Sequence, residues 1–241
     1  MRLIITVFAL VFALGVFFSA ADASRHKAPE KIKVMFFVGG PVHDHVGLSP
    51  ILKEHLDAIG DFDVTITEDM DRMITLEEDK VNVALFFTTG MQITPEQEKG
   101  LIGFVENGGG YAGIHSASDS FKNSDAYWRL VGGRFKSHKS GTFEVHFTVP
   151  NHEAVRGLKG FEITDEDYFH EFHKDAKIVV LARRPKDWEP AVWVQHHGDG
   201  RMFYTGLGHD KRAWENPAFK EVMTRGIYWA AKRQPPQKTC N

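Results

Sequence analysis

Hydrophobic and polar positions alternate in blocks along the first half of the chain. Apolar runs at 31–38, 81–88 and 111–114 are typical of buried strands, and the first two end at loops that contain glycine. Residues 48–59 repeat apolar positions at helical intervals, and a Thr-Pro-Glu-Gln start predicts a second helix over 95–107. Strands that alternate with helices in this way predict a parallel sheet covered on both faces.

The second half of the chain is richer in strands. Its alternating segments predict strands at 142–149, 177–183, 191–196 and 202–207, and a closing helix at 216–233. No linker, repeat or low-complexity tract interrupts the chain. We therefore expect one α/β domain over residues 24–241, a flavodoxin-like sandwich with a mostly parallel central sheet and a strand-rich C-terminal half.

The first 23 residues have the pattern of a secretory signal peptide. Arg2 precedes an apolar run from Leu3 to Phe18, and small residues follow, with cleavage sites at Ala21-Asp22-Ala23 or Phe18-Ser19-Ala20. The alternative is an uncleaved anchor, for which the apolar run is short. We predict export to the periplasm or the exterior, with no stable membrane span after cleavage.

Charge and cysteine content narrow the classes of partner and chemistry. A net charge of −3 with mixed charges gives no reason to expect nucleic acid. The single cysteine, Cys240, excludes an intramolecular disulfide and a cysteine-based metal site. Thirteen histidines suit acid–base chemistry or metal ligation, and five tryptophans suit sugar binding. A small-molecule sugar is the expected partner, and self-association is left open.

The segment Gly108 to Ala117 contains the most informative pattern. A glycine-rich strand leads to His115, and small residues surround it. This is the layout of a nucleophile elbow, a sharp turn that presents one side chain above the edge of a sheet. Hydrolases carry serine at this turn, whereas the neighbouring Ser116 is displaced by one residue. The alternative interpretation is a glycine-rich turn with an incidental histidine.

Three further segments place acid–base groups near predicted strand ends. His209 and Asp210 follow the strand at 202–207 directly. The loop after the first strand carries His43 and His45; two histidines one residue apart point to opposite sides of extended chain, and we prefer His45. The third segment, 165–173, contains Glu166 and Tyr168 among several carboxylates and imidazoles, and a solvated loop explains it equally well. His138 and His152 each stand alone in a predicted loop, and a structural role explains their presence there.

These segments together resemble the ThuA-like (trehalose-utilisation) family, which has a class I glutamine-amidotransferase-like fold. The resemblance extends from about residue 31 to residue 231, and the series that carries it is GGGYAGIHSASD, GGRFKSHKSGTF, NHEAVRGLKGF, ITDEDYF and AVWVQHHGDGRMFYTGLGHDKRAW. It implies that His115 occupies the elbow, that His209 stands at the position of the amidotransferase histidine, and that Asp210 lies near the acid. His45, His138, His152 and Glu166 match other polar positions of the family.

The resemblance implies a role in disaccharide utilisation through 3-keto sugars. Glutaminase chemistry is excluded, because position 115 lacks the thiol that forms the thioester. We expect a sugar-processing hydrolase or lyase with His115 or His209 as the acid–base group and Glu166 or Asp210 as its partner. The residues expected to contact sugar are His45, Ser116, His138 and Tyr168.

A divalent metal bound by two or three of His45, His115 and His209 is an alternative way to activate the sugar. A non-catalytic carbohydrate-binding protein on the same scaffold is the rival from another class. A serine esterase that uses Ser116 and His209 is a third interpretation.

Overall fold

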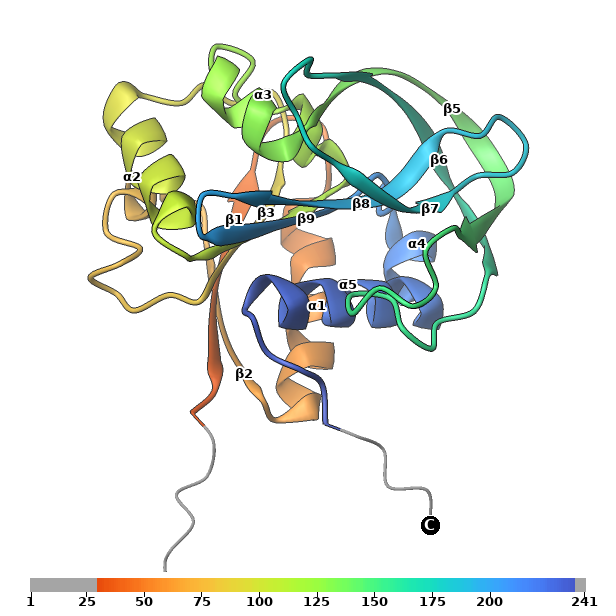
Figure 1. The fold of residues 1–241 in the computed structure, drawn as a ribbon, viewed down its shortest axis with the longest axis horizontal. Coiled ribbons are helices and arrows are strands. Elements are labelled where there is room, and N and C mark those ends of the chain that lie inside the picture. The colour runs from red at the N-terminus through yellow and green to blue at the C-terminus, as the bar shows by residue number, and fades with distance from the viewer. Residues whose placement is uncertain (1–29, 237–241) are drawn as a thin grey trace, which may run out of the picture.

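The structure, a computed structural model, describes residues 30–236. The predicted signal segment and Cys240 lie outside these residues. A nine-stranded mixed sheet forms the centre of the molecule, in the order β2-β1-β3-β4-β9-β8-β7-β5-β6 (Figure 1). None of the helices in this part of the chain has the length and apolar character needed to cross a bilayer.

The first half of the chain, joined by β9 (Gly200–Thr205) from the second half, builds the parallel side of the sheet. Strands β2, β1, β3, β4 and β9 are mutually parallel neighbours. The elements of this half are β1 (Ile32–Gly39), α1 (His45–Ile59), β2 (Phe62–Thr67), η1 (Met70–Met73), β3 (Val83–Thr88), α2 (Pro95–Glu106), β4 (Gly110–Ile114), η2 (His115–Asp119) and α3 (Asp125–Val131).

The second half adds four antiparallel strand pairs, so the sheet is less parallel than the sequence predicted. Strand β8 pairs with β9 and β7, and the long strands β5 and β6 pair with each other. We call the β5–β6 pair the arm. The elements of this half are β5 (Gly133–Phe147), β6 (Phe161–Phe172), β7 (Val179–Arg183), β8 (Pro190–His197), β9 (Gly200–Thr205), α4 (Lys211–Glu215) and α5 (Pro217–Ala230).

Helices cover both faces of the parallel strands, as the alternation of helices and strands predicted. Successive residues of β1 point to opposite faces, so Val34 and Phe36 pack with α1, α4 and α5, whereas Met35 and Phe37 pack with α2 and α3. Figure 1 shows α1 and α5 on one side of the sheet and α2 and α3 on the other. Because both faces are buried, these strands are continuously apolar rather than alternating.

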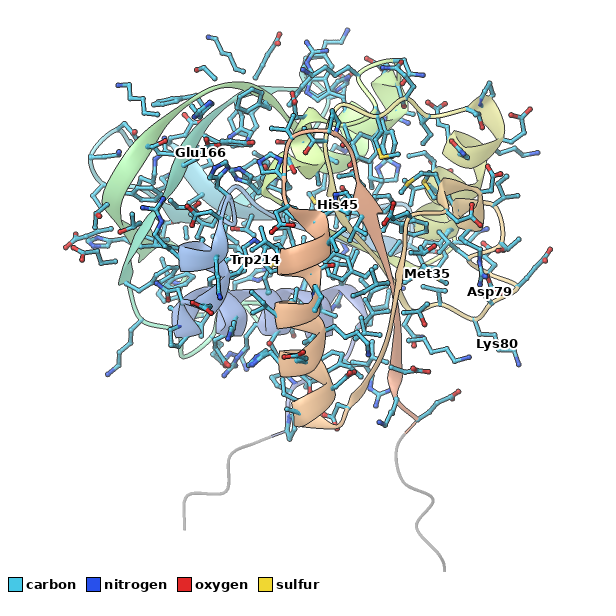
Figure 2. The ribbon with its side chains drawn as sticks, turned by 180° about the vertical axis from the view of Figure 1, so that it is seen from behind. Met35, His45, Asp79, Lys80, Glu166 and Trp214 are labelled. Atoms are coloured by element: carbon cyan, nitrogen blue, oxygen red, sulfur yellow. The ribbon has the colours of Figure 1, made fainter. Side chains whose placement is uncertain are left out.

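The parallel arrangement fixes where the candidate site lies. The carboxyl ends of β1, β4 and β9 meet at one edge of the sheet, and ligands bind at this edge in open α/β sheets. The loops that follow these strands carry His43, His115 and His209 respectively. The arm supplies the opposite wall, with Glu166 on β6 (Figure 2).

Candidate metal centre

Four side chains from four separate segments converge at this edge. One ligand atom each from His43, His115, Glu166 and His209 lies within 4.8 Å of the others. The Glu166 Oε2 atom is 3.4 Å from His115 Nε2 and 3.2 Å from His209 Nδ1. We call these four residues the ligand cluster.

His115 stands on a strained turn, as the elbow pattern predicted. Strand β4 ends at Ile114, and His115 then takes a φ of +46°, a left-handed conformation that is uncommon for residues other than glycine. Its side chain is fully buried, and the Nδ1 atom donates to the Gly206 carbonyl at 2.8 Å. The carbonyl can only accept, so this bond turns the Nε2 atom toward the cluster.

His43, and not the preferred His45, is the imidazole of the first loop that enters the cluster. Gly40, with a φ of +104°, lets this loop approach Thr89 so closely that a Cβ atom would lie 2.1 Å from the Thr89 carbonyl. The Thr89 hydroxyl then lies 2.8 Å from His43 Nδ1, which leaves Nε2 on the inner side. His45 is instead the first residue of α1, after the N-cap Asp44, and its Nε2 lies 3.7 Å from a carboxylate oxygen of Glu68.

A buried carboxylate on β6 holds the third histidine in place. Asp165 accepts the backbone N–H groups of Gly208 at 2.7 Å and His209 at 2.9 Å. Gly208 has a φ of +115°, and its carbonyl accepts the Trp214 indole N–H. Burial raises the pKa of Asp165 above its ordinary value, although the nearby His115 and these backbone N–H groups oppose the shift. The fixed turn presents His209 Nδ1 to the cluster.

The electrostatics of the cluster favour the neutral forms of His43 and His209. Burial, and then the neighbouring His115 and His209, lower the pKa of His43 to about 3. Burial also lowers the pKa of His209, against the attraction of Glu166. At Glu166 burial raises the pKa, but the three histidines nearby outweigh it and the net pKa is lowered. Neutral imidazoles beside an ionised carboxylate are the protonation states that metal ligation requires.

The hydrogen bonding of the cluster fits a metal ion. His43 Nε2, His115 Nε2 and His209 Nδ1 are buried and have no hydrogen-bond partner among the described residues. Three such ring nitrogens in one place leave a large desolvation cost unless something binds them. Zn–N bonds of about 2.0–2.1 Å place tetrahedral ligand atoms roughly 3.4 Å apart, and the two contacts of Glu166 already have this spacing. The donor set suits zinc or another first-row dication.

The remaining predicted residues lie at varying distances from the cluster. His138 Nδ1, on the arm, lies 3.2 Å from Glu166 Oε1, and the Tyr168 ring lies against His115 with 3.8 Å between centroids. Ser116 is fully buried, and its Oγ atom makes no hydrogen bond to any described residue, so the serine–histidine pair of an esterase is not formed here. Asp210 caps α4 and pairs with Arg212.

His152 stands apart from the site. It accepts the Ala154 N–H and its ring faces Trp229, 5.5 Å away between centroids. Asp165, by contrast, was missed as an individual residue. The sequence offered only its place beside Glu166 as a signal.

The comparisons with known proteins agree with this fold. The ThuA family, described as trehalose utilisation, matches residues 33–230. No curated protein is significantly similar to the chain in sequence.

Solved structures resemble the whole of the described fold. A ThuA-like protein from Parabacteroides merdae superposes with a TM-score of 0.76 at 21% identity, over 87% of this chain and 93% of that one. A ThuA-like protein from Bacteroides uniformis superposes with a TM-score of 0.69 at 19% identity, over 88% of this chain and 98% of that one. A GMP synthase subunit from Thermoplasma acidophilum superposes with a TM-score of 0.52 at 12% identity, over 84% of this chain and 96% of that one. The chain therefore belongs to the ThuA family and has an amidotransferase-like fold.

Proposed function

We propose that this protein is a metal-dependent enzyme of disaccharide utilisation that acts on a 3-keto-glycoside. The observation that carries the proposal is the set of three buried ring nitrogens without partners beside the Glu166 carboxylate. His43, His115, His209 and Glu166 would hold the metal. A divalent cation in this position supplies Lewis-acid polarisation of a ligand oxygen such as a sugar ketone.

His138 is the best-placed group for proton transfer. Its Nδ1 lies 3.2 Å from Glu166 Oε1, so the carboxylate favours the tautomer with a proton on Nδ1 and a free Nε2. Its side chain is 44% exposed, which allows contact with substrate and exchange with solvent. His115, by comparison, has its Nδ1 committed to Gly206 and its Nε2 to the cluster.

The proposed reaction is an elimination across C1 and C2 of the keto sugar. A ketone at C3 acidifies the proton on C2. His138 removes this proton, a C1=C2 double bond forms as the C1–O bond to the leaving group breaks, and the departing alkoxide takes up a proton from water. The products are an unsaturated keto sugar and a free alcohol.

The test is turnover of a 3-keto-disaccharide by the metal-depleted and the metal-restored protein. We expect chelation to abolish product formation, zinc or manganese to restore it, and His138→Ala to lower kcat by about 100-fold or more. Full turnover after chelation would contradict metal dependence. Binding of sugar without any product under all conditions would favour a carbohydrate-binding protein instead.

Export belongs to the same proposal. It rests on the charge, apolar run and small residues of the segment 1–23. Mass spectrometry of the protein recovered from its native compartment should show a new N-terminus after Ala20 or Ala23. An intact Met1 would contradict cleavage.

A further inference from the structure

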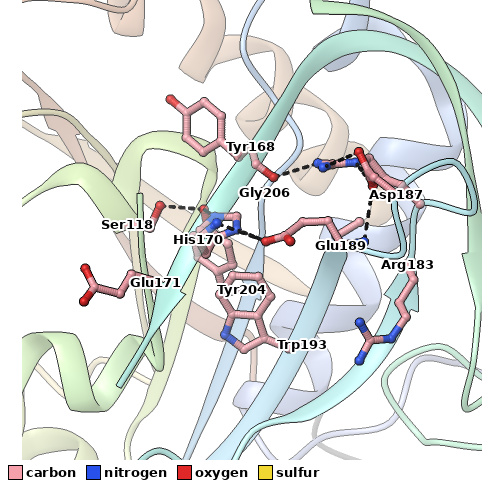
Figure 3. Close-up of polar contacts among 12 residues, drawn as sticks. Ser118, Tyr168, His170, Glu171, Arg183, Asp187, Glu189, Trp193, Tyr204 and Gly206 are labelled. Atoms are coloured by element: carbon pink, nitrogen blue, oxygen red, sulfur yellow. Dashed lines mark hydrogen bonds and ion pairs between the residues drawn. The ribbon is translucent and has the colours of Figure 1, made fainter. Parts of the chain in front are cut away.

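Tyr204 has a buried hydroxyl group that takes no part in the proposed reaction. It comes from β9 and is fully buried, with its ring 4.3 Å from that of Trp193. Its Oη atom donates to the His115 carbonyl at 2.6 Å. Ser118 Oγ lies 2.8 Å from the same Oη atom, and Figure 3 shows Ser118 beside Tyr204. The hydroxyl therefore binds the main chain of His115 rather than the imidazole that faces the other ligands.

The carbonyl that Tyr204 contacts belongs to the one cluster residue with a strained backbone. A left-handed backbone conformation at a residue other than glycine is energetically unfavourable and persists only where its surroundings impose it. Ser118 Oγ donates to the same carbonyl at 3.2 Å, so two hydroxyls converge on it. Both bonds stabilise the turn that directs His115 toward the cluster.

His170 in turn fixes the Tyr204 hydroxyl. Its Nε2 atom lies 3.2 Å from Tyr204 Oη, and its Nδ1 atom lies 3.4 Å from Glu189 Oε1, so the ring contacts a polar group on each side. The His170 ring also packs against Gly206. A Cβ atom added to Gly206 would lie only 3.3 Å from the Cε1 atom of His170. Gly206 carries the carbonyl that orients His115 Nδ1. Tyr204 and His170 together thus support both the main chain and the ring of His115.

We propose that Tyr204, held by His170, is a positioning residue that keeps His115 Nε2 directed at the ligand cluster. This inference rests on the proposed metal site, because the alignment of a ligand is what it explains. Neighbours that orient a metal ligand in this way are worth about 10–100-fold in metal affinity.

The test compares two buried tyrosines. Tyr204→Phe should weaken Co²⁺ binding by about 10–100-fold in a calorimetric titration, keep one ion per chain, and change the visible absorption spectrum of the Co²⁺ protein. Tyr111→Phe is the matched control, because it removes an equally buried hydroxyl whose partner is the Tyr127 hydroxyl. It should leave both the affinity and the spectrum unchanged.

A second measurement on the metal-free protein separates this inference from the proposed function. Nitrogen-15 spectra of the imidazoles should show His115 protonated at Nδ1 alone in the wild type and in Tyr111→Phe, and a shifted His115 signal in Tyr204→Phe. Failure of the wild type to bind Co²⁺ would overturn the metal site, while the imidazole spectra would still decide the role of Tyr204. An unchanged His115 signal together with unchanged Co²⁺ affinity in Tyr204→Phe would overturn the inference.

Discussion

At the level of single residues, the direction of each ring nitrogen decides which histidines belong to the site. His115 has its Nδ1 bound by the Gly206 carbonyl and His43 has its Nδ1 against Thr89 Oγ1, so each directs Nε2 inward. His45 is only two residues from His43, yet it begins α1 and faces Glu68. These differences depend on loop backbone and cannot be read from spacing alone.

His209 and Asp210 are adjacent in sequence but have different roles, which gives a first prediction. His209→Ala should remove a ligand and lower the metal content of the purified protein well below one ion per chain. Asp210→Ala should keep the metal and lower the free energy of unfolding by about 1 kcal/mol, the usual cost of losing an N-cap. Metal analysis and urea unfolding of both variants check this. If Asp210→Ala lost its metal while His209→Ala kept it, His209 would not be the ligand.

At the level of elements, the sequence predicted the parallel strands and their helices well. Continuous apolar runs and the Thr94 capping box are strong local signals, and the observed elements agree with them to within a few residues. Strand β6 was missed because its charged residues resemble a solvated loop, although Asp165 and Asp167 are buried. Long-range pairing with β5 makes it a strand, and single-sequence patterns do not record such pairing.

The arm delivers Glu166 and His138 together, which gives a second prediction. Glu166→Gln should reduce metal affinity strongly, because it removes the anionic ligand. His138→Ala should retain one metal per chain with an affinity lowered by at most about 10–100-fold, because His138 contacts only the outer oxygen of Glu166. Calorimetric titration of both variants with zinc distinguishes the roles. An equal loss in the two variants would contradict this assignment.

At the level of the whole molecule, the two halves of the sheet meet around the site. Parallel strands bring His43, His115 and His209 to one edge, and the antiparallel arm places Glu166 against them. The sequence indicated a site at this edge from the position of strand ends, and it identified three of the four cluster residues. The geometry of the arm was not predictable, because it depends on strand order in the antiparallel half.

His170, on β6, is buried where the arm meets the rest of the sheet, and its burial makes the free energy of unfolding depend on pH. Burial lowers the pKa of His170 below its ordinary value of 6.5; Glu189 opposes this shift and Arg184 adds to it. Below pH 6.5 the unfolded chain therefore binds a proton that the folded protein does not, and stability falls as the pH falls. Urea unfolding of the metal-free protein between pH 5 and 7.5 should show this trend. The slope for His170→Gln should be smaller, by up to about 1.4 kcal/mol per pH unit. Equal slopes would contradict a neutral, buried His170.

His43, His115, Glu166 and His209 are expected to bind one divalent metal ion together. The most direct measurement is the metal content of the purified protein and of two variants, His43→Ala and His45→Ala, after incubation with zinc and dialysis. We expect one zinc per chain in the wild type and in His45→Ala, and little or none in His43→Ala. A wild type that retains no zinc, or a His45→Ala variant that loses zinc while His43→Ala keeps it, would rule out this metal site.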